Sequence, residues 1–295
     1  MCGIMGYYSF GNTLPDKNKI EKMFVLLESR GRDASGFAFI DNISNQLKVT
    51  KAPVPSSHLI KSDIWKSLLL PKKMIFHTRM KTQGDPQNNM NNHPLFTKEG
   101  IAIVHNGMIY NDKEIFSGKI KRDAQVDSEA ILGVMMKNKK NKDLIKTIFD
   151  SLEGIFAVAM INQNEPNKLI LIKKNNPIEL YYNSKDDILY FASERGIMQN
   201  ALDIRTNYKR GFGIGENEYH NYEMEDNHGM VINEKGVESY KCYFPKMKSY
   251  SRYDFNDEVM MECPFCLSKT KYNWIKLDNR CEHCGRYLDV EDVYV

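Results

Sequence analysis

The chain has 295 residues, of which 42% are hydrophobic and 27% are charged, and its formal net charge at pH 7 is +3. This composition is typical of a globular protein, and the near-neutral charge leaves nucleic-acid binding possible but unsupported. No window approaches about 18 uncharged apolar residues, so no membrane span is expected. The start lacks a basic segment followed by a long apolar run, so we expect no secretory signal. These features leave the oligomeric state unknown.

Clusters of predicted strands flank a central pair of predicted helices. After a strand-like opening, apolar residues at helical spacing predict a helix over 16–30, which Gly31 ends. Short turns between most neighbouring strands predict antiparallel sheets packed with helices, an α+β fold. The Asn106-Gly107 pair is expected at the end of a short strand. The predicted strands are 36–40, 46–50, 74–78, 101–104, 154–161, 168–173, 188–192, 229–232 and 237–242, and the further helices are 126–137 and 142–152.

Cysteine at position 2 allows chemistry that an internal cysteine cannot perform. If Met1 is removed, Cys2 carries both a thiol and a free α-amine, so a nucleophile and a candidate base belong to one residue. A free α-amine titrates near about 7.7 to 8.0, and a useful fraction is therefore unprotonated at neutral pH. By position alone Cys2 is only a small residue after the initiator, but segments further along support a catalytic role.

Seven short motifs occur together in a fixed order. They are Cys2-Gly3-Ile4, the segment 30–36, His77-Thr78-Arg79, Thr82-Gln83-Gly84, Asn92-His93-Pro94, His105-Asn106-Gly107 and Asp127-Ser128-Glu129. In this order and rough spacing they resemble the glutaminase domain of class II glutamine amidotransferases, from Cys2 to about Tyr243. The domains of glucosamine-phosphate synthases and amidophosphoribosyltransferases look most similar. The resemblance implies an enzyme with a four-layer αββα sandwich of the N-terminal-nucleophile hydrolase type, which needs no cofactor for glutamine hydrolysis.

Glutamine hydrolysis needs a nucleophile, a proton acceptor, an oxyanion site and a clamp for the amino-acid end. Cys2 can supply the first two: its thiol attacks the side-chain amide, forms a glutamyl thioester and releases ammonia. The Asn106 side chain carries an amide donor, and Gly107 can bring its backbone N–H close because no Cβ intervenes. The resemblance assigns the oxyanion role to these two residues.

The clamp for the amino-acid end is expected from three residues. The planar Arg79 guanidinium suits the α-carboxylate, Thr82 can donate another hydrogen bond, and Asp127 is the counter-charge for the α-ammonium. Alone, Arg79 would pass for a salt-bridged arginine and Asp127 for a helix N-cap. Arg30 and Asp33 are expected to brace the pocket by ion pairing or turn formation.

Two positions depart from the sugar-phosphate branch of the family. Gln83 stands where that branch has histidine, and Met80 stands where an aromatic residue is usual. The phosphoribosyl branch also lacks that histidine, so the departures weaken only an assignment to the hexosamine reaction. His77, His93 and His105 are expected as hydrogen-bonded scaffold, because the α-amine makes a histidine base unnecessary.

The end of the chain carries two Cys-x-x-Cys pairs, Cys263 with Cys266 and Cys281 with Cys284, separated by 14 residues. This spacing suits tetrahedral zinc, and four protein ligands leave no open position, so the metal would be structural. Such a short segment cannot build an adequate core unaided, so the metal would supply most of its folding energy. A rubredoxin-like iron site is the alternative. Cysteines used for metal rather than disulfides favour a cytoplasmic protein.

Composition and motifs divide the chain into a glutaminase domain over 2–243, a linker over 244–262 and a zinc-ribbon module over 263–295. About 50 residues follow the glutaminase-like segment, and they carry no signature of a domain that consumes ammonia. We therefore expect glutamine as substrate and a separate ammonia-accepting enzyme in trans, with the zinc module as a docking device. Its candidate contacts, which could instead only cover the metal, are Phe265, Tyr272, Trp274 and Tyr287.

Two alternatives compete with this interpretation. One is an N-terminal-nucleophile amidase that acts on another amide, and the retained clamp for a zwitterion argues against it. The other is a non-catalytic virion or interaction protein that keeps the fold. The presence of Cys2, Asn106 and Asp127 argues against that reading.

Overall fold

The computed structural model describes residues 2–117, 121–137, 144–204, 218–241, 258–263, 266, 268–273, 280–286 and 288. The chain divides into two compact units, Met1–Tyr243 and Phe244–Val295. Within the described ranges, no helix has both the length and the apolar character needed to cross a membrane.

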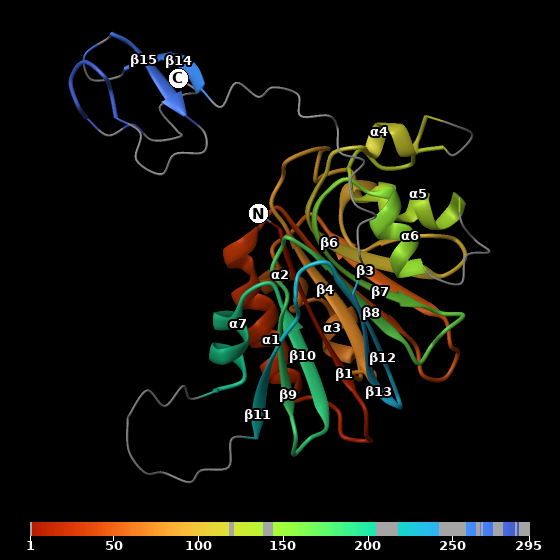
Figure 1. Ribbon diagram of the computed structural model, residues 1–295. Coiled ribbons are helices and arrows are strands. Elements are labelled where there is room, and N and C mark those ends of the chain that lie inside the picture. Colours follow the sequence, from red (N-terminus) through yellow and green to blue (C-terminus); the bar gives the residue numbers. More distant parts are fainter. Residues whose placement is uncertain are drawn as a thin grey trace, which may run out of the picture. The chain divides into compact units, whose positions relative to one another are not determined.

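The first unit contains two antiparallel sheets that stack face to face (Figure 1). The strands of the first sheet are β1 (Gly3–Ser9), β2 (Ala34–Ile40), β3 (Leu47–Ala52), β4 (Lys73–Arg79), β9 (Glu179–Asn183), β10 (Ile188–Ala192) and β11 (Tyr219–Glu223). Their order is β11-β9-β10-β1-β4-β2-β3. The central strand β1 pairs Gly3 with Thr78 of β4 and Met5 with Ala192 of β10. The first residues of the chain therefore lie in the middle of a sheet.

The second sheet has the order β13-β12-β8-β7-β6-β5. Its strands are β5 (Leu95–Phe96), β6 (Ile101–Ile109), β7 (Gly154–Asn162), β8 (Leu169–Lys174), β12 (His228–Asn233) and β13 (Gly236–Lys241). Strand β6 is longer than expected, because β7 pairs with it as far as Ile109, opposite Gly154. Asn106 and Gly107 thus lie within a strand, and the prediction of a strand end at this point was wrong.

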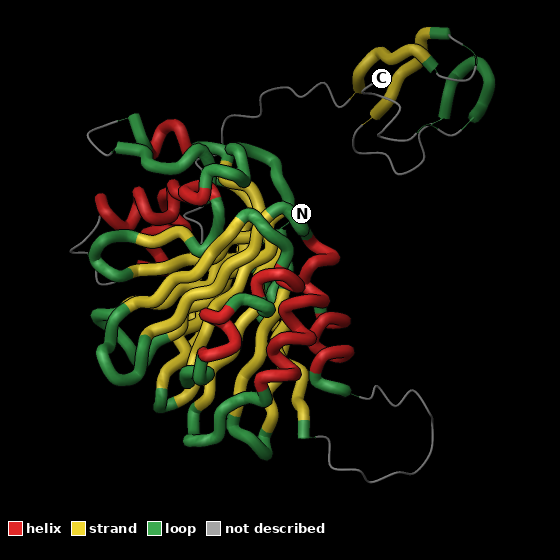
Figure 2. Tube along the Cα trace, turned by 180° about the vertical axis from the view of Figure 1, so that it is seen from behind, coloured by secondary structure: helices red, strands yellow, loops and turns green. Residues whose placement is uncertain are grey.

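Helices cover the outer face of each sheet (Figures 1 and 2). On the first sheet they are α1 (Lys17–Leu26), α2 (Ser56–Leu59), α3 (Asp63–Ser67) and α7 (Arg195–Ala201), and on the second α4 (Asp112–Ile115), α5 (Glu129–Lys137) and α6 (Leu144–Ser151). In α1, Asp16 caps the N-terminus by accepting from Asn18 N at 2.8 Å, and Ile20, Met23 and Phe24 are buried at helical spacing. The predicted helix 16–30 is therefore α1 followed by a 3₁₀ turn, Leu27–Arg30.

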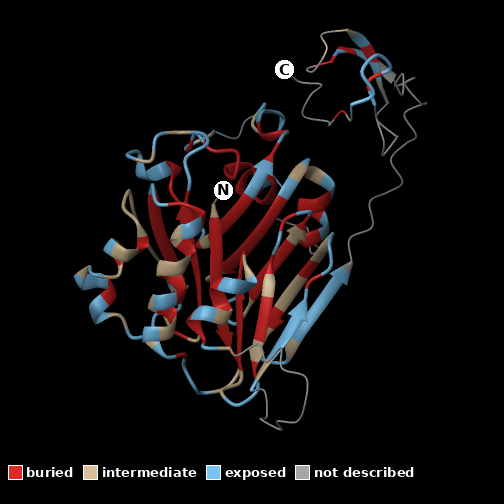
Figure 3. Cartoon of the chain, turned by 90° about the vertical axis from the view of Figure 1, so that its left-hand side faces the viewer, coloured by how far each residue is buried: buried red, intermediate tan, exposed pale blue. Residues whose placement is uncertain are grey.

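Three apolar layers result, one between the sheets and one beneath each set of helices. Figure 3 shows the buried residues concentrated in the central strands. The four-layer αββα sandwich expected from the sequence is confirmed. Elements absent from the prediction include the short helices α2 and α3, the helix α7, and the strands β9 and β11.

The second unit contains one hairpin, in which β14 (Glu258–Glu262) pairs with β15 (Lys269–Asn273). Its described buried side chains are few. They are Met261, Cys263, Thr270, Cys281 and Leu288. The cysteines therefore form a large part of the interior described for this unit.

Candidate active site and metal centre

Cys2 lies directly before β1, where that strand meets the end of β4. Its Sγ donates to Met80 O at 3.6 Å, and its carbonyl oxygen accepts from Arg30 Nε at 3.2 Å. Burial raises the pKa of the Cys2 thiol; the contact with Met80 and the charge of Arg79 oppose this rise, whereas the Asp127 carboxylate adds to it. A thiol in this environment needs a proton acceptor before it can act as a nucleophile.

Arg30 and Asp33 both hold backbone close to Cys2. Besides contacting the Cys2 carbonyl, the Arg30 guanidinium forms an ion pair with Glu194 at 2.7 Å. The Asp33 carboxylate accepts from Lys81 N at 2.6 Å, and Asp33 N donates to Arg79 O at 2.9 Å. Arg30 thus fixes the residue that carries the thiol, and Asp33 fixes the chain after β4.

Three histidines fill the space between β4 and β6. His77 Nε2 lies 3.0 Å from His105 O, and His105 Nδ1 lies 2.7 Å from Ser128 Oγ. His93 stacks on His77 at 4.2 Å, but neither of its ring nitrogens has a hydrogen-bond partner among the described residues. Burial lowers the pKa of His77 to about 3 and that of His93 well below its usual value, so both rings are neutral at pH 7.

The hydrogen bond between His77 and His105 crosses from one sheet to the other. It brings the strand that pairs with β1 next to the segment of β6 that carries Asn106 and Gly107. Asn106 is only 2% exposed, and its side-chain nitrogen is buried with no hydrogen-bond partner in the described part of the chain. A buried amide donor without a partner is unfavourable unless a ligand or water completes it. Asn106 therefore offers an uncommitted donor on the residue after His105, where β6 meets β4.

Gly107 has a backbone conformation that only glycine adopts easily, with φ of +140°. A Cβ at this position would lie 2.1 Å from Ile155 O of the paired strand. Gly154 shows the same relation across the strand pair, because its Cβ would lie 2.1 Å from Met108 O. The strands β6 and β7 thus approach each other closely on both sides of this point.

Arg79 ends β4 and is buried, with 3% exposure. Its Nη1 donates to Asn92 Oδ1 at 2.7 Å, and its Nη2 donates to Gln83 O and to Gly84 O. A guanidinium has five N–H groups, so these three bonds leave two for a ligand. Thr82 is exposed, and its hydroxyl makes no hydrogen bond to a described residue, so the structure does not attach it to Arg79.

Asp127 lies before α5 and is 8% exposed. Its Oδ2 accepts from Ile109 N of β6 at 2.7 Å, so its carboxylate binds a strand rather than capping the helix. The preceding chain is fastened by Glu129, whose carboxylate accepts from Asp123 N at 2.8 Å and Ala124 N at 3.0 Å. Hydrogen bonds therefore hold both Asp127 and the backbone that precedes it.

Sequence reasoning missed several polar residues that support this region. Asn176 donates to Asn106 O, and Asn91 is fully buried in the loop before β5, next to Asn92 of the Asn-His-Pro motif. The amide side chains of Asn91 and Asn92 bind other residues of the chain, among them Gln125 and Arg79. The only available signal was the density of amide side chains near the Asn-His-Pro motif.

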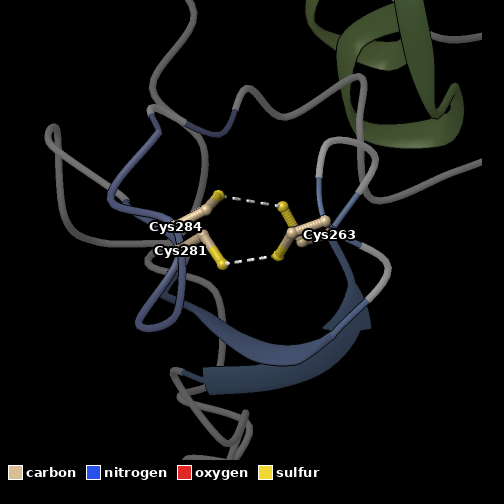
Figure 4. Close-up of side chains that lie close together, drawn as sticks. Cys263, Cys281 and Cys284 are labelled. Atoms are coloured by element: carbon tan, nitrogen blue, oxygen red, sulfur yellow. Dashed lines mark hydrogen bonds between the residues drawn. The ribbon is translucent and has the colours of Figure 1, made fainter.

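The four cysteines of the second unit lie together, with all sulfur atoms within 4.8 Å of one another (Figure 4). Cys263 Sγ is 3.8 Å from Cys284 Sγ, and Cys266 Sγ is 3.6 Å from Cys281 Sγ. Turns orient them, since Cys263 N donates to Ser268 O at 3.0 Å and Cys281 N to Arg286 O at 2.9 Å. Four thiolates without carboxylates suit a soft metal ion in tetrahedral geometry.

Several sequence predictions fall on residues outside the described ranges. They are Phe265, Trp274, Tyr287 and the side chain of Tyr272. A separate cavity of about 480 Å³ lies past the far end of β1, between Phe10, Tyr182, Tyr222 and Met230. None of the residues predicted for glutamine hydrolysis lines this cavity.

The fold, with a cysteine before the central strand, defines a domain of the N-terminal-nucleophile hydrolase type. Residues 77–200 match a family described as a glutamine amidotransferase domain. Glutamine--fructose-6-phosphate aminotransferase [isomerizing] of Aquifex aeolicus is 34% identical over 186 residues, which are 60% of this chain and 30% of that protein. The protein of the same name from Francisella tularensis is 29% identical over 92% of this chain and 44% of its own length. The chain thus spans less than half the length of these curated relatives.

Solved structures agree on the fold. A glutamine phosphoribosylpyrophosphate amidotransferase from B. subtilis, in complex with ADP and GMP, has a TM-score of 0.61 at 18% identity and covers 81% of this chain and 49% of its own. A glutamine aminotransferase class-II domain protein from Silicibacter pomeroyi has a TM-score of 0.52 at 13% identity, covering 82% of this chain and 100% of its own. The chain carries a class II glutamine amidotransferase domain, the domain of an enzyme family.

Proposed function

We propose that the protein hydrolyses the side-chain amide of glutamine, with Cys2 as the nucleophile once Met1 is removed. The observation that carries this proposal is the buried side-chain nitrogen of Asn106, which has no hydrogen-bond partner among the described residues and is followed by a glycine with φ of +140°. A tetrahedral oxyanion requires hydrogen-bond donors of this kind, and in the proposal both face the carbon that the Cys2 thiol attacks. The raised pKa of Cys2 fits a reaction in which its own α-amine takes the thiol proton.

In the proposed reaction, Cys2 Sγ attacks the amide carbon while the thiol proton passes to the α-amine. The negative charge that forms on the amide oxygen is held by Asn106 Nδ2 and Gly107 N–H. Collapse of this intermediate returns the proton to the leaving nitrogen, releases ammonia and leaves a glutamyl thioester. Water then hydrolyses the thioester to glutamate and restores the thiol.

The amino-acid end of glutamine would be held by opposite charges. The two uncommitted N–H groups of Arg79 suit the α-carboxylate, and the Asp127 oxygen that does not bind Ile109 suits the α-ammonium. In this proposal Thr82 adds a hydrogen bond only when substrate is present. Arg30 and Asp33 hold the backbone on which Cys2 and Arg79 depend.

We further propose that the ammonia passes to a separate acceptor enzyme. Large apolar side chains are exposed beside the site: Met80 is 50% exposed, Met108 is 46% exposed and Tyr110 is 61% exposed. Exposed apolar groups around a reactive site favour a protein partner. The second unit is proposed to hold structural zinc through Cys263, Cys266, Cys281 and Cys284 and to serve in docking. These four cysteines form no disulfide, which favours a reducing compartment such as the cytoplasm.

The proposal is tested first by the intact mass of the purified protein, which tells whether Met1 is present. Ammonia release from glutamine is then measured for the wild type, for Cys2→Ser and for a form that keeps Cys2 but retains Met1, made by inhibiting the methionine aminopeptidase of the expression host. We expect loss of activity by orders of magnitude in both altered forms. Full activity in a chain that retains Met1 would overturn the proposal.

A further inference from the structure

One buried amide connects the two segments that carry the proposed clamp charges. Asn91 ends the 3₁₀ turn Asn89–Asn91 and is 0% exposed. Its Oδ1 accepts from Gln125 N at 2.7 Å, and its Nδ2 donates to Gln125 Oε1 at 3.1 Å and to Asp85 O at 3.0 Å. All three bonds reach other segments of chain, so Asn91 serves as a cross-link.

One side of this cross-link leads directly to Arg79. Gly84, which precedes Asp85, accepts from the Arg79 guanidinium at 2.9 Å. A Cβ on Gly84 would lie 2.8 Å from the Asn91 amide, so this turn packs against Asn91 with no space between them. The next residue, Asn92, accepts from Arg79 Nη1 at 2.7 Å. Any movement of Asn91 therefore shifts the groups that orient the guanidinium.

The other side leads to Asp127, two residues after Gln125. The N–H groups of the two residues before Gln125 are held by the Glu129 carboxylate, and Asp127 is held by Ile109 N at 2.7 Å. Between these two anchor points, Asn91 binds both the backbone and the side chain of Gln125. Asn91 thus holds Gln125, which the Glu129 carboxylate and Ile109 N do not contact.

We propose that Asn91 is a positioning residue that sets the separation between the Arg79 guanidinium and the Asp127 carboxylate, and so the recognition of the α-amino-acid end of glutamine. This inference rests on the proposed function. The charges that grip the two ends of a zwitterion come from separate segments, and a misplacement of about 1 Å can cost about 100-fold in rate. A reciprocal amide pair fixes both distance and orientation, because donor and acceptor must align together.

The test compares two reagents that both alkylate Cys2. A diazoketone analogue of glutamine must be gripped at its amino-acid end, whereas iodoacetamide requires only an accessible thiol. For Asn91→Ala we expect labelling by the glutamine analogue to slow by about 10- to 100-fold, and labelling by iodoacetamide to stay within about twofold. The KM for glutamine should rise more than kcat falls. Gln87→Ala is the matched control, because its exposed side chain on the same loop binds no described residue.

Gln125 variants keep the test decisive if Asn91→Ala fails to fold. Gln125→Ala removes an exposed side chain but keeps the backbone N–H that binds Asn91, so the same selective slowing should be smaller. Gln125→Glu keeps an oxygen acceptor for Asn91 Nδ2 and should restore labelling. Equal slowing with both reagents, or none in either alanine variant, would overturn the positioning role alone. A wild-type chain that reacts with iodoacetamide but not with the glutamine analogue would refute the proposed function as well.

Discussion

The two units of this protein differ in what holds them together. The first buries three apolar layers between and around its sheets, whereas the described interior of the second consists mainly of Met261, Leu288 and cysteines. A large sandwich can fold from hydrophobic burial alone, but a unit of this size needs a covalent or metal cross-link. The groups proposed for catalysis and the metal site proposed to stabilise the second unit therefore lie in different units. The proposed chemistry belongs to the first unit and the proposed metal site to the second.

Removal of the metal should have the largest effect and should act on the second unit alone. Apparent binding energies of structural zinc are about 10 to 16 kcal/mol, so Cys263→Ser combined with Cys281→Ser should unfold this unit and abolish metal binding. Elemental analysis of the wild type, with zinc expected in place of iron, and hydrogen exchange of each unit provide the measurement. Ammonia release should persist in the variant, and its loss would show that the units depend on each other.

Trp65→Ala should destabilise the first unit and leave the second unit unchanged. Trp65 is 0% exposed, packs against Phe37 and Phe76, and donates to Glu21 at 2.7 Å. Its truncation should lower the free energy of unfolding by about 3 to 5 kcal/mol without changing the metal content. Urea unfolding followed by circular dichroism measures this change. Ile64→Ala, in the same helix but at a site that is 60% exposed, serves as the control and should stay within about 0.5 kcal/mol.

Asn106→Ala should remove chemistry from the first unit while leaving its fold intact. Loss of one oxyanion donor costs about 100- to 1,000-fold in kcat. Because the Asn106 side-chain nitrogen has no partner among the described residues, its removal should not destabilise the sandwich. Steady-state ammonia release, read together with thermal unfolding, separates the two effects. An unchanged kcat would place the oxyanion site elsewhere.

Asp127→Asn should have a smaller effect, directed at substrate binding. The change keeps an oxygen for Ile109 N but removes the counter-charge for the substrate ammonium. We expect KM for glutamine to rise by about 10- to 100-fold, with less change in kcat. A simple amide without the amino-acid end should react equally slowly with both proteins. A selective loss with that amide would contradict the clamp.

Low pH should decrease the stability of both units, but through the protonation of different groups. In the first unit, burial lowers the pKa of His77 to about 3, below the value of about 6.5 expected in the unfolded chain. The stability from keeping this ring neutral is therefore present above pH 6.5 and is lost as pH falls towards 3, by about 1.4 kcal/mol per pH unit. Unfolding at several pH values should show a shallower slope for His77→Gln and an unchanged slope for exposed His58→Gln. Metal release from protonated thiols should dominate in the second unit.

Apolar periodicity predicted individual helices and strands and the α+β class, because it reports on burial. The four-layer sandwich was implied only by the resemblance that the ordered motifs carry. Strand β10 was predicted with its observed bounds, and β6 was placed correctly but ended too early. The error arose because Asn106-Gly107 is a turn signal in isolation, whereas here β7 supplies a partner for every residue of β6. Tertiary pairing overrode the local preference.

The site was predictable only in part. Motifs indicated Cys2, Arg79 and Asp127, and the structure places the charges of Arg79 and Asp127 close enough for each to act on the pKa of the Cys2 thiol. Their roles remain predictions, as do the domain boundaries. Nothing in the sequence indicated that Asn91 reaches Gln125, because an amide in a polar loop has no periodicity to reveal which segment it will meet.

The close approach of β6 and β7 sets a limit on how this sequence can vary. Gly107 and Gly154 each face a carbonyl oxygen at 2.1 Å from where a Cβ would be, so at either position any side chain would force the strands apart. In a saturation library selected for folding, both positions should tolerate glycine alone. A comparison of sequences would then show two invariant positions of which only one takes part in the proposed chemistry. Invariance at position 154 would reflect the spacing of backbones and not contact with a substrate.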